Sequence, residues 1–330
     1  MKKIDGLTPE IIKRSDGQPC SGLLSVEGRE LYVETYGRYG KPAILFLHGG
    51  PGTSCVEQQE MAVLLSEKYF VVSFDQYGVF RSGDIADDEI FGMREHVEQM
   101  EQMRKLLGIQ AWILLGHSYG GMLVCYYTYL HPESVLASLY ENPGWNFIQN
   151  AKGIAQHYID AYYRFHPDEK EGLAAAEAII TKDYTGREGE SVWDILKAQR
   201  YVKDKKVTMY MHSIEPHQYF DLFEKCHKEL EVDEDWVDAK ELRHIEKLVE
   251  AGDMFLDHRP EIEKNQAPAL LLNGKYDPVC TERDRMYFAK HAPHGKIVLL
   301  ENSAHHPRVE QKEEYLQAIF DFLRDEGLEA

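Results

Sequence analysis

Residues 111–130, AWILLGHSYGGMLVCYYTYL, decide how this chain folds. The segment 111–115 is an uninterrupted apolar run, as in strands that are covered on both faces. The segment 121–130 is apolar over a length that suits a buried helix, and GHSYG at 116–120 separates the two. A strand, a sharp glycine-flanked turn and a helix in this order predict that the hydroxyl of Ser118 is exposed at the apex of the turn.

Further apolar runs on both sides of this segment predict more buried strands, each ending in polar or glycine residues. They are PAILFLHGG (42–50), YFVVSFDQYG (69–78), VLASLYENPG (135–144), ALLLNGKYDP (269–278) and KIVLLEN (296–302). Helical patterns such as 96–108 lie between several of them, so the sequence predicts an α/β protein with a mostly parallel sheet and helices on both faces. Ligands of such sheets bind at the carboxyl ends of the strands.

Two segments depart from this alternation. Residues 23–37 alternate around Glu27-Gly28, which predicts a β-hairpin at an edge of the sheet. The alternation stops after about Gly144 and resumes near Ala267, and the intervening residues are helical in character. We therefore expect an α/β core formed by residues 1–145 and 266–330, with residues 146–265 inserted as a helical cap.

The composition excludes several kinds of protein. With 37 basic and 56 acidic residues the net charge is −19, which argues against nucleic acid and anionic membranes as partners. The five cysteines form no C-x-x-C pair and no zinc-ligand spacing, so we expect no metal and a reducing, cytoplasmic location. The basic N-terminus is not followed by an apolar run of signal-peptide length.

A nucleophilic serine needs a base to accept its proton and an acid to orient that base. Asp277 follows one late strand and is the predicted acid, and His305 follows the next strand and is the predicted base. Two alternatives stay open at this stage. His306 adjoins His305 and competes as the base, and Glu141 ends the strand that follows Ser118 and competes as the acid.

The segment HGGPG at 48–52 also follows a buried strand. Glycines there let main-chain N–H groups approach a reacting carbonyl closely. We predict an oxyanion hole formed by the N–H groups of Gly50 and of Tyr119, the residue after Ser118.

These motifs resemble the α/β-hydrolase superfamily and, within it, the prolyl aminopeptidase (proline iminopeptidase) family of serine peptidases. The similar blocks are residues 26–52, 74–82 (FDQYGVFRS), 116–121 (GHSYGG) and 131–133. Position by position, the resemblance implies a catalytic triad of Ser118, Asp277 and His305, with Gly50 and Tyr119 as oxyanion donors. It also implies a helical cap.

The chain differs from the family where Tyr77, Phe80 and Tyr119 stand in place of the usual Arg, Gly and Trp, and where Glu141-Asn142-Pro143 replaces Leu-Arg-Gly. Acidic cap residues of the family bind the free amine of the substrate, and Asp194 is the nearest counterpart that we find here.

We expect a serine hydrolase that acts through an acyl-enzyme and requires no cofactor, with a small molecule or short peptide as substrate. A proline iminopeptidase-like aminopeptidase is the first interpretation, and a carboxylesterase or lactonase is the second. A non-catalytic ligand-binding protein is a remote third. The sequence does not predict the oligomeric state.

Overall fold

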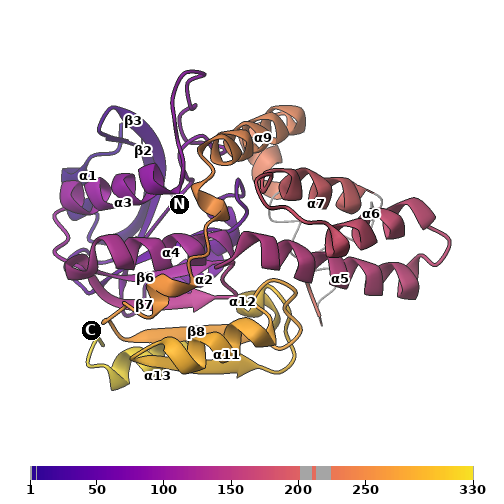
Figure 1. Ribbon diagram of the computed structural model, residues 1–330. Coiled ribbons are helices and arrows are strands. Elements are labelled where there is room, and N and C mark those ends of the chain that lie inside the picture. The colour runs from indigo at the N-terminus through magenta and orange to yellow at the C-terminus, as the bar shows by residue number, and fades with distance from the viewer. Residues whose placement is uncertain (1, 5, 201–209, 213–223, 330) are drawn as a thin grey trace.

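The computed structural model describes residues 2–4, 6–200, 210–212 and 224–329 (Figure 1). The strands are β1 Lys2–Ile4, β2 Gly17–Val26, β3 Arg29–Gly37, β4 Ala43–Leu47, β5 Phe70–Phe74, β6 Trp112–His117, β7 Val135–Glu141, β8 Ala269–Gly274 and β9 Gly295–Leu300. The α-helices are α1 Pro9–Lys13, α2 Gln59–Leu65, α3 Met93–Leu107, α4 Tyr119–Leu130, α5 Phe147–Phe165, α6 Lys170–Thr181, α7 Glu190–Arg200, α9 Glu234–Ala251, α10 Arg259–Ile262, α11 Glu282–His291, α12 Pro307–Glu310 and α13 Lys312–Asp325. Short 3-10 helices are η1 Cys55–Gln58, η2 Pro132–Ser134 and η3 Asp253–Phe255.

The strands form one sheet in the order β1-β2-β3-β5-β4-β6-β7-β8-β9. Strands β4 to β9 pair in parallel, whereas β3 pairs antiparallel with both β2 and β5. The predicted mostly parallel sheet is therefore confirmed. Its six parallel strands direct their carboxyl ends to one edge, where Ser118, Asp277 and His305 follow their strands.

The predicted hairpin is present as β2 and β3 near one end of the sheet. Glu27 and Gly28 connect the strands with φ angles of 50° and 83°, as a two-residue turn with two positive φ angles requires. Strand β1 pairs in parallel with β2 and lies outside the hairpin. The sequence pattern did not predict β1.

Two apolar layers cover the sheet, one on each face. On one face α3 and α4 pack on strand residues that include Leu45 and Leu114. On the other face α2 and α13 pack on the alternate residues, which include Ile44 and Ile113. Adjacent strand residues point to opposite faces, so continuous apolar runs are needed where both faces are covered.

Helices α5, α6, α7 and α9 follow β7 and precede β8, and Figure 1 shows α5, α6 and α7 gathered beside the sheet. Buried side chains of α5 and α6, including Tyr158, Tyr162 and Ile179, form an apolar cluster of their own. Residues 201–209 and 213–223 of the predicted cap lie outside the described residues. Among those described, no helix is both long and apolar enough to cross a membrane.

Candidate active site

Ser118 occupies the sharp turn that the sequence predicted between β6 and α4. Its φ angle is 54°, a conformation that L-residues rarely adopt. A Cβ atom on Gly116 would lie 2.3 Å from the main-chain oxygen of Gly120. A Cβ atom on Gly120 would lie 2.5 Å from the main-chain oxygen of Leu47. Glycine is therefore required on both sides of Ser118.

The main chain of Ser118 is held firmly in place. Its N–H donates to the main-chain oxygen of Glu141 across 2.9 Å, and its own oxygen accepts from Gly121, Met122 and Gly144. The residue caps the N-terminus of α4 and retains 8% exposure. Unpaired N–H groups of a helix N-terminus favour negative charge that develops beside the serine.

The structure brings Asp277 and His305 together. Nδ1 of His305 donates to Oδ1 of Asp277 across 2.7 Å, and both side chains are almost fully buried. The main-chain N–H groups of Val279 and Cys280 also donate to this carboxylate. These contacts fix the imidazole so that its other nitrogen, Nε2, is the one available for proton transfer.

His305 also lies beside the elbow, the sharp turn at residues 116–120 that carries Ser118. The ring of His117 is centred 4.6 Å from the ring of His305, and its Nε2 donates to the main-chain oxygen of His305 across 2.9 Å. Among the described residues, Ser118 Oγ makes no hydrogen bond with His305. Such a bond is often long in a protein without substrate.

The two alternatives from the sequence, His306 and Glu141, have other partners. His306 packs against the ring of His117, and burial holds the pKa of its imidazole well below the usual value. Glu141 binds Arg308 through one carboxylate oxygen and the hydroxyl of Tyr315 through the other. The structure therefore pairs His305 with Asp277, and it gives Glu141 a different set of partners.

The glycine-rich segment at 48–52 packs directly against the elbow. A Cβ atom on Gly49 would lie 3.2 Å from Cβ of Ser118. Gly50 has a φ angle of 109°, which only glycine adopts readily. Tyr119 is the first residue of α4, so its N–H has no partner in a preceding helical turn.

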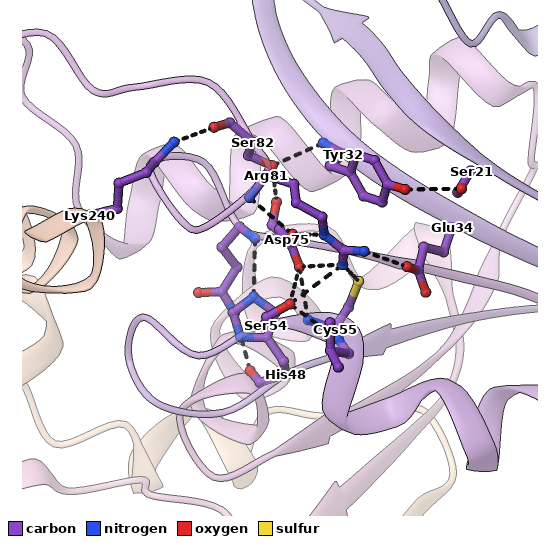
Figure 2. A network of polar contacts seen from close by, with 12 residues as sticks. Ser21, Tyr32, Glu34, His48, Ser54, Cys55, Asp75, Arg81, Ser82 and Lys240 are labelled. Carbon is purple, nitrogen blue, oxygen red and sulfur yellow. Dashed lines mark hydrogen bonds and ion pairs between the residues drawn. The ribbon is translucent and has the colours of Figure 1, made fainter. Parts of the chain in front are cut away.

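A buried polar network lies beside this segment (Figure 2). Asp75 accepts hydrogen bonds from Ser54, Cys55 and Arg81, and Arg81 also binds Glu34. Burial raises the pKa of Asp75, but Arg81 outweighs this effect and lowers it to about 2. The carboxylate is therefore ionised at neutral pH and holds the segments after β4 and β5 together.

The region between β7 and β8 contacts His305 through Tyr210. The main-chain N–H of His305 donates to the oxygen of Tyr210 across 2.9 Å, and the two rings are centred 5.3 Å apart. Asp194, by contrast, binds Lys182 at 2.6 Å and the Tyr184 hydroxyl at 2.9 Å. A substrate amine at Asp194 would have to compete with Lys182.

One buried cluster has ligand types that metals accept: Glu57, His117 and His306. Nη2 of Arg308 lies 3.1 Å from Oε2 of Glu57 and already supplies a positive charge there. A metal ion would have to displace or tolerate that guanidinium. We therefore interpret the cluster as an ionic network.

Sequence reasoning missed Glu57, Arg308 and Tyr210. Each contacts residues of the candidate site, but none belongs to a motif. Their sequence separations from Ser118 do not indicate a shared site either. The one available signal was the occurrence of charged residues, Glu57 and Arg308, close after the segments that carry Gly50 and His305.

Comparisons with known proteins agree with the fold. A family model described as the alpha/beta hydrolase fold matches residues 42–154. A proline iminopeptidase of Heyndrickxia coagulans is 24% identical over 92% of this chain and 98% of its own length. A crystal structure of proline iminopeptidase from Mycobacterium smegmatis superposes with a TM-score of 0.65 at 18% identity, covering 93% of this chain and 99% of that one. An enol-lactonase from Burkholderia xenovorans LB400 superposes with a TM-score of 0.57 at 18% identity, covering 92% and 98%.

The fold, the elbow and the family model define this chain as a hydrolase with the α/β-hydrolase fold. Within that class its sequence resembles the proline iminopeptidases. Both expectations from the sequence are thereby confirmed.

Proposed function

We propose that the protein is a serine hydrolase that forms an acyl-enzyme on Ser118. Oγ of Ser118 attacks the substrate carbonyl and gives its proton to Nε2 of His305, which passes it to the leaving amine or alcohol. Water then attacks the acyl-enzyme, with His305 again accepting and returning a proton. The hydrogen bond of 2.7 Å between His305 and Asp277, at the loops next to the strained Ser118 elbow, is the observation that carries this proposal.

We further propose that the N–H groups of Gly50 and Tyr119 bind the oxygen that becomes negative during attack. The packing of Gly49 on Ser118 and the position of Tyr119 at the start of α4 support this assignment. Loss of one such donor costs about 3 kcal/mol in the barrier.

The substrate that we propose first is a peptide or amide with a free N-terminal amine, as the resemblance to the proline iminopeptidases implies. Residues 146–265 would form a cap over the site, and an acidic side chain of this cap would bind the amine. Asp194 is the candidate from the sequence, although its ion pair with Lys182 makes the carboxylate less available to a substrate amine.

A second candidate is an ester or lactone hydrolase. The ring of Tyr210 beside His305 provides an apolar wall that suits an uncharged acyl group. The structural likeness to an enol-lactonase fits the same interpretation but shows only the shared fold.

The test compares proline-β-naphthylamide, its N-acetylated form, other aminoacyl-naphthylamides and short p-nitrophenyl esters. An aminopeptidase cleaves the free-amine naphthylamides and rejects the acetylated one. Turnover of esters alone would favour the second candidate. Ser118→Ala should abolish all turnover, by a factor on the order of 10⁶. A variant that keeps a tenth of the activity would contradict the nucleophile assignment.

We also propose a reducing location such as the cytoplasm, because all five cysteines are free thiols and four of them are buried. Isolation under non-reducing conditions with thiol counting tests this, and an intramolecular disulfide would contradict it.

A further inference from the structure

A buried ionic network lies directly behind the candidate active site. Arg308 binds Glu141 through Nη1 at 2.6 Å and Glu57 through Nη2 at 3.1 Å. The three side chains are at most 2% exposed. They come from α12, β7 and η1, which are distant from one another in the sequence.

Glu57 connects this network to the oxyanion segment and to the elbow. Its Oε1 accepts the main-chain N–H of Gly49 across 3.0 Å and lies 3.6 Å from Nδ1 of His117. Gly49 precedes the proposed donor Gly50, and His117 precedes Ser118. The Glu57 carboxylate thus contacts both the segment that carries the proposed oxyanion donor Gly50 and the elbow that carries Ser118.

Arg308 and Glu141 connect the same network to the base. Arg308 lies three residues after His305. Glu141 accepts the N–H of Ser118 through its main-chain oxygen while its side chain binds Arg308. His117 completes this set of contacts, because its Nε2 donates to the main-chain oxygen of His305.

We propose that Arg308, through Glu57 and Glu141, is a positioning residue that sets the distance between Ser118, His305 and the oxyanion donors. This proposal rests on the proposed serine hydrolase mechanism. None of the three side chains touches the reacting atoms; they act through the main chains of Gly49, Ser118 and the loop that carries His305.

The charges support a positioning role. Burial opposes ionisation of Glu57, but Arg308 holds the pKa of this carboxyl well below its usual value, so the pair is ionised. A planar guanidinium can bridge two carboxylates in fixed directions, which an ammonium group cannot do. The arrangement therefore constrains η1 and the end of β7 at once.

The test measures the rate at which a fluorophosphonate modifies Ser118, because this reaction needs the positioned triad and no knowledge of the substrate. Glu57→Gln keeps an oxygen for Gly49 but removes the charge that faces Arg308. We expect modification about 10–100-fold slower, since small displacements of reacting groups cost this much. The reagent concentration at half-saturation should change less than about twofold, because the network does not contact the reagent.

Glu101→Gln is the matched control. Like Glu57, Glu101 is a buried carboxylate that pairs with an arginine, Arg104 at 2.7 Å, and it also accepts from the Tyr127 hydroxyl at 2.6 Å. Both variants should lower Tm, but Glu101→Gln should leave the modification rate within about twofold of wild type. Equal rates for Glu57→Gln and wild type, or equal slowing in both variants, would overturn the proposal.

Arg308→Lys keeps the positive charge and provides a second measurement if Glu57→Gln does not fold. We expect a rate between those of wild type and Glu57→Gln, and a rate equal to wild type would overturn the proposal. Failure of the proposed function gives a different result, because the wild-type protein would then not be modified at Ser118.

Discussion

Gln76 and His48 bind each other twice, across the ends of two neighbouring strands. The main-chain N–H of Gln76 donates to Nε2 of His48 at 3.0 Å, and the side-chain amide of Gln76 donates to the main-chain oxygen of His48 at 3.1 Å. The ring therefore carries its proton on Nδ1, which donates to the oxygen of Gly49. These two hydrogen bonds hold the first residue of the glycine-rich segment against the chain that follows β5.

Replacing Gln76 with Met should reduce turnover without preventing folding. The side chains are similar in length, but Met cannot donate to the oxygen of His48, so the proposed oxyanion segment loses one of its fixed points. We expect kcat to fall about tenfold with little change in KM, because positioning acts on the transition state. Steady-state kinetics check this. An unchanged kcat would show that this contact of the glycine-rich segment does not contribute to catalysis.

Asp277→Asn should reduce kcat by about 10⁴-fold while the protein stays folded. Asn can still contact His305, but its amide group no longer holds the imidazole in the required tautomer or stabilises its positive charge. The measurement is kcat beside circular dichroism of the same sample. Loss of less than tenfold would show that Asp277 is not the orienting acid.

His305 and His306 should respond very differently to substitution. His305→Ala removes the imidazole that binds Asp277, so turnover should fall by a factor on the order of 10⁶. His306→Ala removes a ring packed on His117, and we expect stability to fall more than activity. Kinetics and thermal denaturation of both variants decide between them, and equal, mild losses would remove both from the mechanism.

The positions of the parallel strands along the chain and the position of the elbow could be predicted because each rests on local sequence. A continuous apolar run such as 112–115 is needed for a strand covered on both faces, and Gly116 and Gly120 leave the room that the turn requires. Asp277 and His305 were predictable because parallel strands place their carboxyl ends at one edge.

The contacts that the sequence did not predict are those between distant segments. Nothing near Arg308 in the sequence indicates that its guanidinium bridges Glu57 and Glu141, because that bridge depends on three elements, η1, β7 and α12, that meet only in the fold. Tyr210 is a similar case, since a tyrosine in a helical segment is usually part of an apolar cluster. Choosing His305 over His306 likewise required the direction of each ring.

The elbow should tolerate no side chain at Gly120. In Gly120→Ala the new Cβ atom would lie 2.5 Å from the oxygen of Leu47 and 2.6 Å from that of His48. Overpacking of this kind costs about 1–3 kcal/mol of unfolding free energy. Gly83→Ala is the control, because its nearest neighbour would be 3.3 Å away. Urea denaturation compares the two variants, and equal stability would contradict the tight packing.

Acid should weaken the protein in part through His244 of α9. Its Nδ1 donates to the main-chain oxygen of Tyr77 across 2.9 Å, and its ring stacks on that of His96. Burial lowers the pKa of His244 from 6.5 to about 3, so the folded protein keeps this ring neutral where the unfolded chain protonates it. The stabilisation is fully present above pH 6.5 and is lost progressively as the pH falls toward 3.

This contribution amounts to about 2.5 kcal/mol between pH 6 and pH 4. His244→Asn keeps a donor for Tyr77 but cannot titrate, so the free energy of unfolding should decline less steeply over that range by about this amount. Urea denaturation at pH 6, 5 and 4 gives the change of the unfolding free energy with pH for both proteins. His294→Asn is the control, because it alters an exposed ring, and its unfolding free energy should change with pH as that of the wild type does. Parallel slopes for His244→Asn and wild type would mean that folding does not lower the pKa of His244.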